Sequence, residues 1–576
     1  MKFVRTLVLL LLAASCLFGQ RMPPAVAPDR PLPERPALSR EILAAPVAAS
    51  ARLSAASEGA GDSLAALRAW NEAGRTPYRD GFARTLRAPL VLKRGGGRAI
   101  ASAEAPGVRA RVDVAGAEGL RLHVAKFSLP PGTDMWVWSD GATPIWFNTS
   151  LAGGASEFWT PSVWSDHINF AISAPPGDYE IELDSVLQYV APGRGPQIQS
   201  TECLIDGACP GTNILDVVAQ YRKAVAHLRY VNGAESYICS GALIIDSAQS
   251  FTPYLLTANH CLSTQAEASS LEAYWDYIAS SCGAAPPNPA TVPRSNSSTL
   301  LSTSAATDVT LVRLSAIPSG RIFLGWTADA GDVPNGAILH RLSHPEGLPM
   351  AYSVTRVDTS VGTCETKGRP SYIYSTSING GGGVAGGSSG SPVILAGGYI
   401  VGQLFGHCGP EPGNACNGAN NTVDGALSAS FPLLAAYLSP STTCSACVPD
   451  AKTACLLGNR FKVTMPNWTD SGAGLSGQGS IIKYADNVES VHPTFGPLSA
   501  SAFFSMYSFA PSSIETLVRM IKGQNINNKY WVFLTGFAGA SYTVRIEDTQ
   551  TCTVWQRQVP AKATNVVKDF EAFAFP

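Results

Sequence analysis

Three short segments of the chain carry a histidine, an aspartate and a serine in settings that suit nucleophilic chemistry. His260 ends the apolar run LLTANHC (255–261), Asp308 precedes the alternating run VTLVRL (309–314), and Ser389 lies in GGSSGSP (386–392). A serine hydroxyl is a weak nucleophile at neutral pH and needs a base within hydrogen-bond reach, a role for which imidazole has a suitable pKa. A carboxylate behind the imidazole fixes its tautomer and stabilises the imidazolium. The three residues therefore predict acyl transfer, with Ser389 as nucleophile, His260 as base and Asp308 as the orienting carboxylate.

The glycines around the serine suggest how the developing negative charge would be stabilised. Because glycine has no Cβ, it lets the main chain approach a substrate closely and turn its N–H groups toward an oxyanion. We expect the backbone N–H groups of Gly387 and Ser389 to form this oxyanion hole. Each segment alone has an ordinary structural interpretation, such as a cap residue or a flexible Gly/Ser linker. Their occurrence together, in the order His, Asp, Ser, is much more specific.

The elements that must position these residues are expected to be mainly strands. At 576 residues the chain is too long for one hydrophobic core. Its 45% hydrophobic and 15% charged residues indicate a globular protein, and its 54 Gly and 41 Pro favour many turns and short strands. The net charge of -2 gives no electrostatic argument for nucleic acid or for an anionic membrane surface as a partner.

The first residues resemble an export signal. Lys2 and Arg5 precede an apolar run at 7–14 and then small residues, which predicts a secretory signal peptide over 1–19 and a secreted protein. A single membrane anchor is the alternative, although the run is shorter than the roughly 20 residues that span a bilayer. Lipidation at Cys16 is a second alternative. Removal of the signal leaves twelve of the thirteen cysteines, and an even number in an exported chain predicts disulfides.

Composition and patterning divide the rest of the chain. We expect a Pro/Ala-rich pro-segment or linker at 20–84, a β-sandwich pro-domain at 85–197, the catalytic domain at 198–438, a linker at 439–446 and a second β-sandwich at 447–576. The first sandwich contains several tryptophans that fit either core packing or a carbohydrate-binding platform: Trp136, Trp138, Trp146, Trp159 and Trp164.

The motifs resemble those of the trypsin/chymotrypsin superfamily, and more closely its bacterial lysyl endopeptidase branch. That branch carries Gly-Ser-Ser-Gly-Ser-Pro where the animal enzymes carry Gly-Asp-Ser-Gly-Gly-Pro. The resemblance covers residues 198–438 and includes CLIDGACP (203–210) and VGQL (401–404). It implies a chymotrypsin-like double β-barrel flanked by the two β-sandwich modules. It also implies a monomeric serine endopeptidase that acts on protein or peptide substrates without a cofactor or metal.

The same resemblance implies a set of disulfides. It pairs Cys239 with Cys261, Cys209 with Cys282, and Cys203 with Cys416. Two cysteines of this region then remain, Cys364 and Cys408, and we expect them to pair with each other. In the last module two further bridges are expected among four cysteines, with the connectivity open: Cys444, Cys447, Cys455 and Cys552.

Activation is expected to differ from that of the animal enzymes. Those enzymes bury a new N-terminus against an aspartate just before the nucleophile, and here Ser388 stands at that position. A buried ammonium without a carboxylate partner is costly. We therefore predict that the N-terminal region covers or assists the catalytic domain and is cut away near 195–202.

Substrate preference is less well defined by the sequence. Similar enzymes select lysine through an acidic residue in the pocket wall, and Thr422 occupies the aligned position here, with Asp424 two residues further on. Residues two apart on a strand share a face, so Asp424 could bind a cationic side chain or could be a turn residue.

His340 and His344 have a spacing that could suggest zinc, but Pro345 and the lack of a nearby acidic or thiol partner argue against a metal site.

The competing hypothesis for the whole chain is a secreted adhesion protein with a catalytically silent domain.

Overall fold

The computed structural model of the chain describes most of residues 21–574. The ranges outside the description within that span are 29–34, 55–59, 95–106, 131–132, 174–177, 191–203, 210–217, 365, 379–381, 413, 440–445, 471–474, 488–489, 493–499, 507–513, 524–525, 528, 537, 551–553, 560 and 562–564. The expected signal peptide and Cys16 therefore lie outside the described residues. The chain forms two compact units, 1–439 and 440–576. None of the described helices is long and apolar enough to cross a membrane.

The second half of the first unit contains a closed six-stranded β-barrel. Each strand pairs antiparallel with two neighbours, so that the last strand returns to the first. In order around the barrel the strands are β22 (Ile338–Ser343), β23 (Ala351–Val357), β24 (Tyr372–Ser377), β27 (Asn421–Ala426), β26 (Tyr399–Cys408) and β25 (Pro392–Leu395). Helix α6 (Leu427–Leu438) follows β27 directly.

A half-barrel precedes the closed barrel in sequence, which confirms the mainly β, chymotrypsin-like double-barrel fold. Its strands run in the order β17 (Arg294–Asn296), β16 (Glu272–Trp275), β13 (Val225–Asn232), β14 (Glu235–Leu243), β15 (Tyr254–Ala258), β19 (Val309–Leu314) and β18 (Ser298–Ser304). Helix α5 (Gln265–Ser270) begins at a capping box formed by Thr264 and Glu267. One hydrophobic core runs through both barrels and includes Leu256, Val312 and Ile394.

The N-terminal β-sandwich packs two sheets over a core of its own. One sheet has the order β3 (Val47–Leu53), β5 (Gly107–Val114), β10 (His167–Ser173), β7 (Met135–Trp138) and β8 (Ile145–Phe147). The other contains β4 (Tyr78–Arg94), β11 (Tyr179–Tyr189), β6 (Gly119–Ser128) and β9 (Phe158–Trp159). Trp136 and Trp138 are buried in a small cluster with Ile42 of helix α2 (Arg40–Ala44), so these two tryptophans serve packing.

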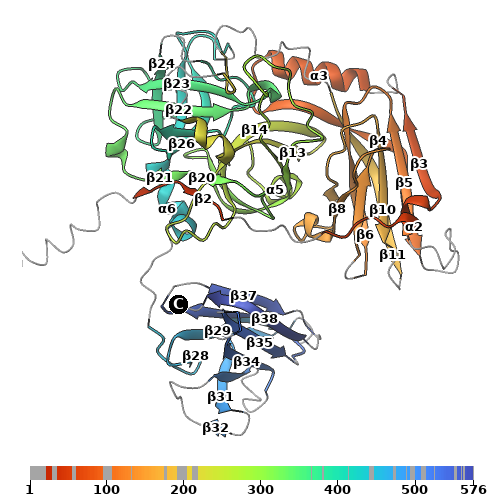
Figure 1. Cartoon of the computed structure of the whole chain (residues 1–576), viewed down its shortest axis with the longest axis vertical. Helices are drawn as coiled ribbons and strands as arrows, with labels where there is room; N and C mark the ends of the chain where they lie inside the picture. Colours follow the sequence, from red (N-terminus) through yellow and green to blue (C-terminus); the bar gives the residue numbers. More distant parts are fainter. Residues whose placement is uncertain are drawn as a thin grey trace, which may run out of the picture. The chain divides into compact units, whose positions relative to one another are not determined.

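The sandwich and the half-barrel share one continuous sheet. Strand β4 pairs antiparallel with β14, and this pairing joins the sandwich strands to the barrel strands. Helix α3 (Ala60–Glu72) packs on β4 where the two parts meet (Figure 1). Residues within 20–84, which the sequence assigned to a pro-segment or linker, thus include a 13-residue helix and the start of a sheet strand. Arg21 and Met22 also pair with strand β21 (Gly325–Thr327).

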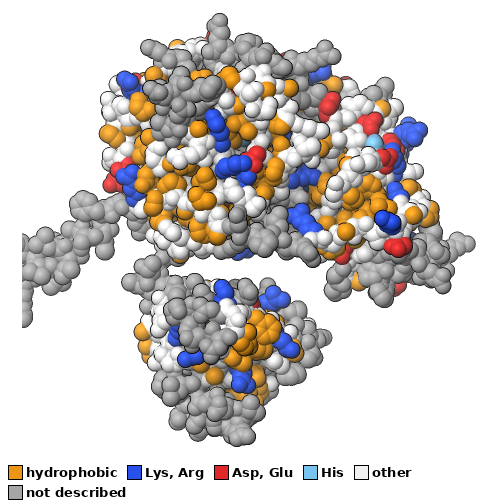
Figure 2. All heavy atoms as spheres, viewed as in Figure 1, with side chains coloured by type: hydrophobic (Ala, Val, Ile, Leu, Met, Phe, Trp, Pro, Cys, Tyr) orange, Lys and Arg blue, Asp and Glu red, His pale blue; other side chains and the backbone are white. Residues whose placement is uncertain are grey.

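The C-terminal unit is a second β-sandwich. One sheet contains β28 (Thr453–Leu456), β29 (Phe461–Asp470), β30 (Leu475–Gly477), β36 (Ser541–Asp548) and β37 (Val554–Val559). The other contains β31 (Ser480–Asn487), β32 (Ser490–His492), β33 (Ser501–Ser505), β34 (Thr516–Lys522), β35 (Lys529–Gly536) and β38 (Asn565–Ala574). Its core is separate from that of the barrels. Figure 2 shows hydrophobic side chains gathered on one part of this unit beside Lys and Arg.

Candidate active site

Two neighbouring strands of the half-barrel bring His260 and Asp308 together. Strand β15 ends at Ala258 and β19 begins at Val309, and these two residues are paired in the antiparallel ladder. Nδ1 of His260 lies 2.8 Å from Oδ2 of Asp308, and the backbone N–H of His260 donates to Oδ1 at 2.9 Å. Asp308 is only 3% exposed. A buried carboxylate held by both the ring and the backbone of His260 orients the imidazole and favours the tautomer with the proton on Nδ1.

The backbone of Asp308 is held in place by a buried glutamine. Asp308 has a left-handed backbone with φ of 53°, which is uncommon for a residue other than glycine. Nε2 of Gln403 donates to the carbonyls of Thr307 at 2.9 Å and Asp308 at 3.0 Å. The VGQL motif contains Gln403 but does not indicate this contact. Its side chain links the closed barrel to the backbone of Asp308 in the half-barrel.

The nucleophile loop comes from the closed barrel and packs against the half-barrel. Ser389 is 2% exposed, and its carbonyl accepts from the backbone N–H of Ser240 on β14 at 2.8 Å. A Cβ on Gly390 would lie 2.8 Å from the backbone nitrogen of Ala258, so this loop touches the end of the strand that delivers His260. Nε2 of His260 is buried and makes no hydrogen bond within the described part of the chain. That nitrogen is free to act as a base.

Gly387, which was predicted to contribute to an oxyanion hole, has a left-handed backbone that packs closely against its surroundings. Its φ is +94°, and a Cβ at this position would lie 2.7 Å from the carbonyl oxygen of His344. Oγ of Ser240 donates to the Gly387 carbonyl at 3.0 Å and so turns that carbonyl toward the half-barrel. Because only glycine fits this backbone without strain, the loop geometry depends on Gly387.

Ser388, the residue before Ser389, makes a hydrogen bond with another uncharged side chain. Ser388 is fully buried, and its Oγ accepts a hydrogen bond from Oγ of Ser343 at 3.1 Å. No carboxylate is therefore offered at this position to a buried ammonium group.

Asp424, for which the sequence allowed contact with a cationic substrate side chain or a place in a turn, is a buried strand residue. It lies on β27 with no exposed surface, and its Oδ1 accepts from Nη2 of Arg341 on β22, which is itself 1% exposed. Burial raises the pKa of Asp424, and the charge of Arg341 opposes that rise. The carboxylate faces the barrel interior and already has a cationic partner. Thr422, also buried, pairs with Ser375 of β24 in the ladder and does not line the cavity at Ser389.

A cavity of about 400 Å³ adjoins the nucleophile. Its lining comes from the closed barrel and from the region around the α3–β4 turn: Asn71, Gly74, Arg75, Thr76, Tyr78, Glu346, Val384, Ala385, Gly386, Ser389, Leu404, Gly406, His407, Pro412, Asn414, Ala415 and Cys416. Phe405, which follows Leu404, packs edge-on against His260 with the ring centroids 5.7 Å apart. The cavity can receive a substrate side chain next to the serine.

Three of the four disulfides expected in this region are present. They join Cys209 to Cys282, Cys239 to Cys261, and Cys364 to Cys408. Cys416 is disulfide-bonded, and its expected partner, Cys203, lies outside the described residues. In the C-terminal unit Cys447 pairs with Cys455, whereas Cys444 and Cys552 lie outside the description. The Cys239–Cys261 bridge ties the residue after His260 to β14.

The two histidines considered for zinc have protein partners. Nδ1 of His340 lies 2.9 Å from the hydroxyl of Tyr352, and Nδ1 of His344 lies 3.2 Å from the carbonyl of Leu348. Burial lowers the pKa of His344 to about 3. His344 is therefore neutral at physiological pH.

The two barrels, with His260 and Asp308 on the first and Ser389 on the second, have the architecture of chymotrypsin-like serine proteases. Residues 198–424 match the family model described as "Lysyl endopeptidase, C-terminal domain". The lysyl endopeptidase of Pseudomonas aeruginosa is 26% identical over 301 residues, which cover 49% of this chain and 63% of that protein. The match thus spans less than two thirds of the relative. It confirms the resemblance predicted from the motifs.

Solved structures of bacterial proteases are also similar to the chain. The active form of the Rv3671c protease from M. tuberculosis shares 17% identity, with 43% of this chain and 93% of that chain covered and a TM-score of 0.27. The MamO protease domain from Magnetospirillum magneticum shares 15% identity, with 37% and 96% covered and a TM-score of 0.26.

Proposed function

We propose that the chain is a secreted serine endopeptidase that cleaves proteins through an acyl-enzyme. The observation that carries the proposal is the pair of hydrogen bonds from His260 to a buried Asp308, next to a serine loop packed on the same strand end. An imidazole fixed in this way, with Nε2 unpaired, is suited to take a proton from a serine hydroxyl. The similarity to lysyl endopeptidase supports the same function.

In the proposed mechanism Ser389 Oγ attacks the carbonyl carbon of a peptide bond while His260 Nε2 takes the hydroxyl proton. The N–H groups of Gly387 and Ser389 stabilise the oxyanion, and Asp308 stabilises the imidazolium. His260 then returns the proton to the leaving amine, and an ester between Ser389 and the acyl group remains. Water attacks this ester with His260 again as base, which releases the acid and restores Ser389.

Hydrolysis of a protein substrate tests this proposal. The secreted wild-type chain should degrade denatured casein, and His260→Ala and Ser389→Ala should each lose nearly all of that activity while keeping the thermal unfolding temperature of the wild type. Equal degradation by the wild type and both variants would reject the proposal.

We also propose that the region before the barrels limits access until the chain is processed near 195–202. The turn between α3 and β4 lines the cavity of Ser389, with Arg75 and Thr76 among its residues. A Cβ on Gly386 would lie 3.1 Å from Cδ2 of Tyr78, so Tyr78 touches the loop that leads to the nucleophile. Sequencing of the fragment that carries Ser389, separated from the active secreted protein by denaturing electrophoresis, should then give an N-terminus near 195–202, and an N-terminus near Gln20 on that fragment would contradict this proposal.

Cleavage after Lys or Arg, which the resemblance implies, would need an acidic group other than Asp424. That carboxylate is buried in the barrel and forms an ion pair with Arg341.

A further inference from the structure

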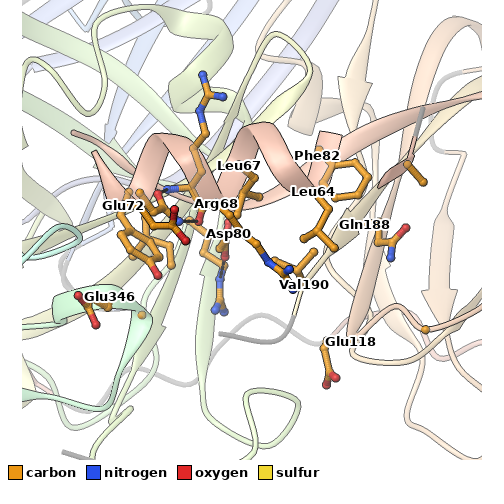
Figure 3. A pocket seen from close by; sticks show the side chains of 18 of the residues that line it. Leu64, Leu67, Arg68, Glu72, Asp80, Phe82, Glu118, Gln188, Val190 and Glu346 are labelled. Atoms are coloured by element: carbon orange, nitrogen blue, oxygen red, sulfur yellow. Dashed lines mark hydrogen bonds and ion pairs between the residues drawn. The ribbon is translucent and has the colours of Figure 1, made fainter. Parts of the chain in front are cut away.

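Glu346 occupies a junction between two cavities. It is the one carboxylate among the described residues that line the 400 Å³ cavity of Ser389. Together with Asn71 and Tyr78, it also lines a larger cavity of about 570 Å³ under helix α3. Figure 3 shows Glu346 coming from the barrel side of this larger cavity, apart from Arg68 and Glu72 of α3. A peptide that runs from Ser389 toward the larger cavity would pass this carboxylate.

The backbone of Glu346 is fixed to the nucleophile loop. Its N–H donates to the carbonyl of Gly386 at 2.5 Å, and Gly386 directly precedes Gly387 of the predicted oxyanion hole. Glu346 also has a left-handed backbone with φ of 51°, within the short turn Pro345–Gly347. A non-glycine residue in this conformation costs free energy, and such positions are often found at functional sites. The backbone that carries this carboxylate is therefore fixed next to the loop of Ser389.

The carboxylate of Glu346 lacks a counter-charge. Its side chain is exposed, and among the described residues it makes no hydrogen bond or ion pair, although Arg75 lines the same cavity. Partial desolvation raises the pKa of Glu346. Burial, together with the negative charges of Glu346 and Asp80, raises the pKa of Tyr78 to about 12. The nearby Arg229 is already paired with Asp80 at 2.6 Å. A cation arriving beside Glu346 would be stabilised.

We propose that Glu346 recognises a Lys or Arg side chain of the polypeptide substrate, at a position next to the residue whose carbonyl is attacked and not at that residue itself. Apart from Arg75 and Glu346, the described lining of the cavity of Ser389 is uncharged, as at Leu404 and Asn414. A flexible ammonium or a guanidinium fork can reach a carboxylate in such a lining and form a charge-assisted hydrogen bond. This inference rests on the proposed endopeptidase function.

Cleavage-site profiling with a positional peptide library tests the inference. The full chain, processed as it is when secreted, is compared with Glu346→Gln and with Asp329→Asn, which changes an exposed carboxylate in the barrel part of the chain that lines neither cavity. The wild type and Asp329→Asn should prefer Lys or Arg at one position adjacent to the cleaved residue. In Glu346→Gln the kcat/KM advantage of the basic residue should fall on the order of tenfold, the loss expected for one charge-assisted hydrogen bond. Preferences at the other positions should stay as they are.

Two results would overturn the inference: an unchanged profile in Glu346→Gln, or loss of selectivity only at the cleaved residue.

A second measurement separates failure of the inference from failure of the endopeptidase proposal. Fluorescent pentapeptide mixtures carrying a fixed Lys or a fixed Gln are titrated into Ser389→Ala and into Ser389→Ala/Glu346→Gln. Tighter binding of a Lys mixture that disappears with Glu346→Gln supports the inference even if the wild type shows no turnover. Equal binding of both mixtures by both variants contradicts it.

Discussion

At the scale of single residues, the proposed activity depends on how Asp308 holds His260. Replacing Asp308 by Asn keeps the size of the side chain but offers an amide N–H where the imidazole needs an acceptor. The wrong tautomer of His260 would then face Ser389. We predict that Asp308→Asn lowers kcat by about 10⁴-fold with an unchanged unfolding temperature. Steady-state kinetics and a thermal melt check this, and Asp329→Asn, at an exposed turn, is the control. A drop below about tenfold would show that Asp308 does not orient the base.

The Arg341–Asp424 pair leads to a prediction about stability. Both side chains are buried, so removal of one partner leaves an uncompensated charge in the barrel. Asp424→Asn should lower the free energy of unfolding by about 3–5 kcal/mol, measured by urea denaturation. The double variant Arg341→Met/Asp424→Leu should recover most of that loss. Selective loss of cleavage at Lys or Arg without loss of stability would instead assign Asp424 to substrate binding.

The residues of the proposed triad could be predicted from sequence because short motifs at strand ends carry them. The place of Asp424 could not be predicted in this way. Alternation along a strand identifies residues that share a face, but it does not show which face is interior or that Arg341, 83 residues away, supplies a partner. Glu346 gave no motif signal, since its position depends on a turn that meets the Gly386 carbonyl.

At the scale of elements, strand β4 makes the N-terminal sandwich part of the half-barrel. Its pairing with β14 is reinforced by the buried Asp80–Arg229 ion pair. We predict that both pieces of a chain cut within 195–202 co-elute in size-exclusion chromatography. Asp80→Asn leaves Arg229 as an unpaired buried charge, which should weaken the association by about 3–5 kcal/mol and release the N-terminal piece on dilution.

The control for this prediction is Lys126→Gln, which removes an exposed ion pair with Glu180. Exposed pairs contribute about 0–1 kcal/mol, so this variant should co-elute like the wild type. Separation of the two pieces of the unsubstituted chain would contradict a stable pairing between β4 and β14.

The elements before residue 85 were the hardest to predict. Helix α3 has the sequence AGDSLAALRAWNE, whose apolar residues are mostly alanines and give a weak periodic signal, and it buries only Ala60 and Leu67. Tertiary contact with β4 stabilises it more than its own pattern does. By contrast, the short alternating strands of both sandwiches follow the period-two pattern of the sequence closely, as in the burial of β5.

At the scale of the whole molecule, residues 440–576 form a compact unit of their own. It has its own hydrophobic core and the Cys447–Cys455 disulfide. We predict that a chain ending at Ser439 keeps the kcat/KM of the full chain for short peptides, and that residues 440–576 alone unfold cooperatively. Peptide hydrolysis and thermal denaturation of the two fragments check this. Loss of peptide hydrolysis in the shortened chain would show that the C-terminal unit contributes to the active site.

The central claim is that Ser389 is a nucleophile activated by His260, and covalent labelling tests it most directly. A fluorophosphonate probe reacts with a serine only where a base and an oxyanion hole activate the hydroxyl. After incubation of the secreted protein with the probe, peptide mass mapping should find one adduct, on Ser389. Labelling should be absent in Ser389→Ala and almost absent in His260→Ala. A correctly folded, processed protein that takes up no probe, or takes it up equally in the His260→Ala variant, would contradict the account.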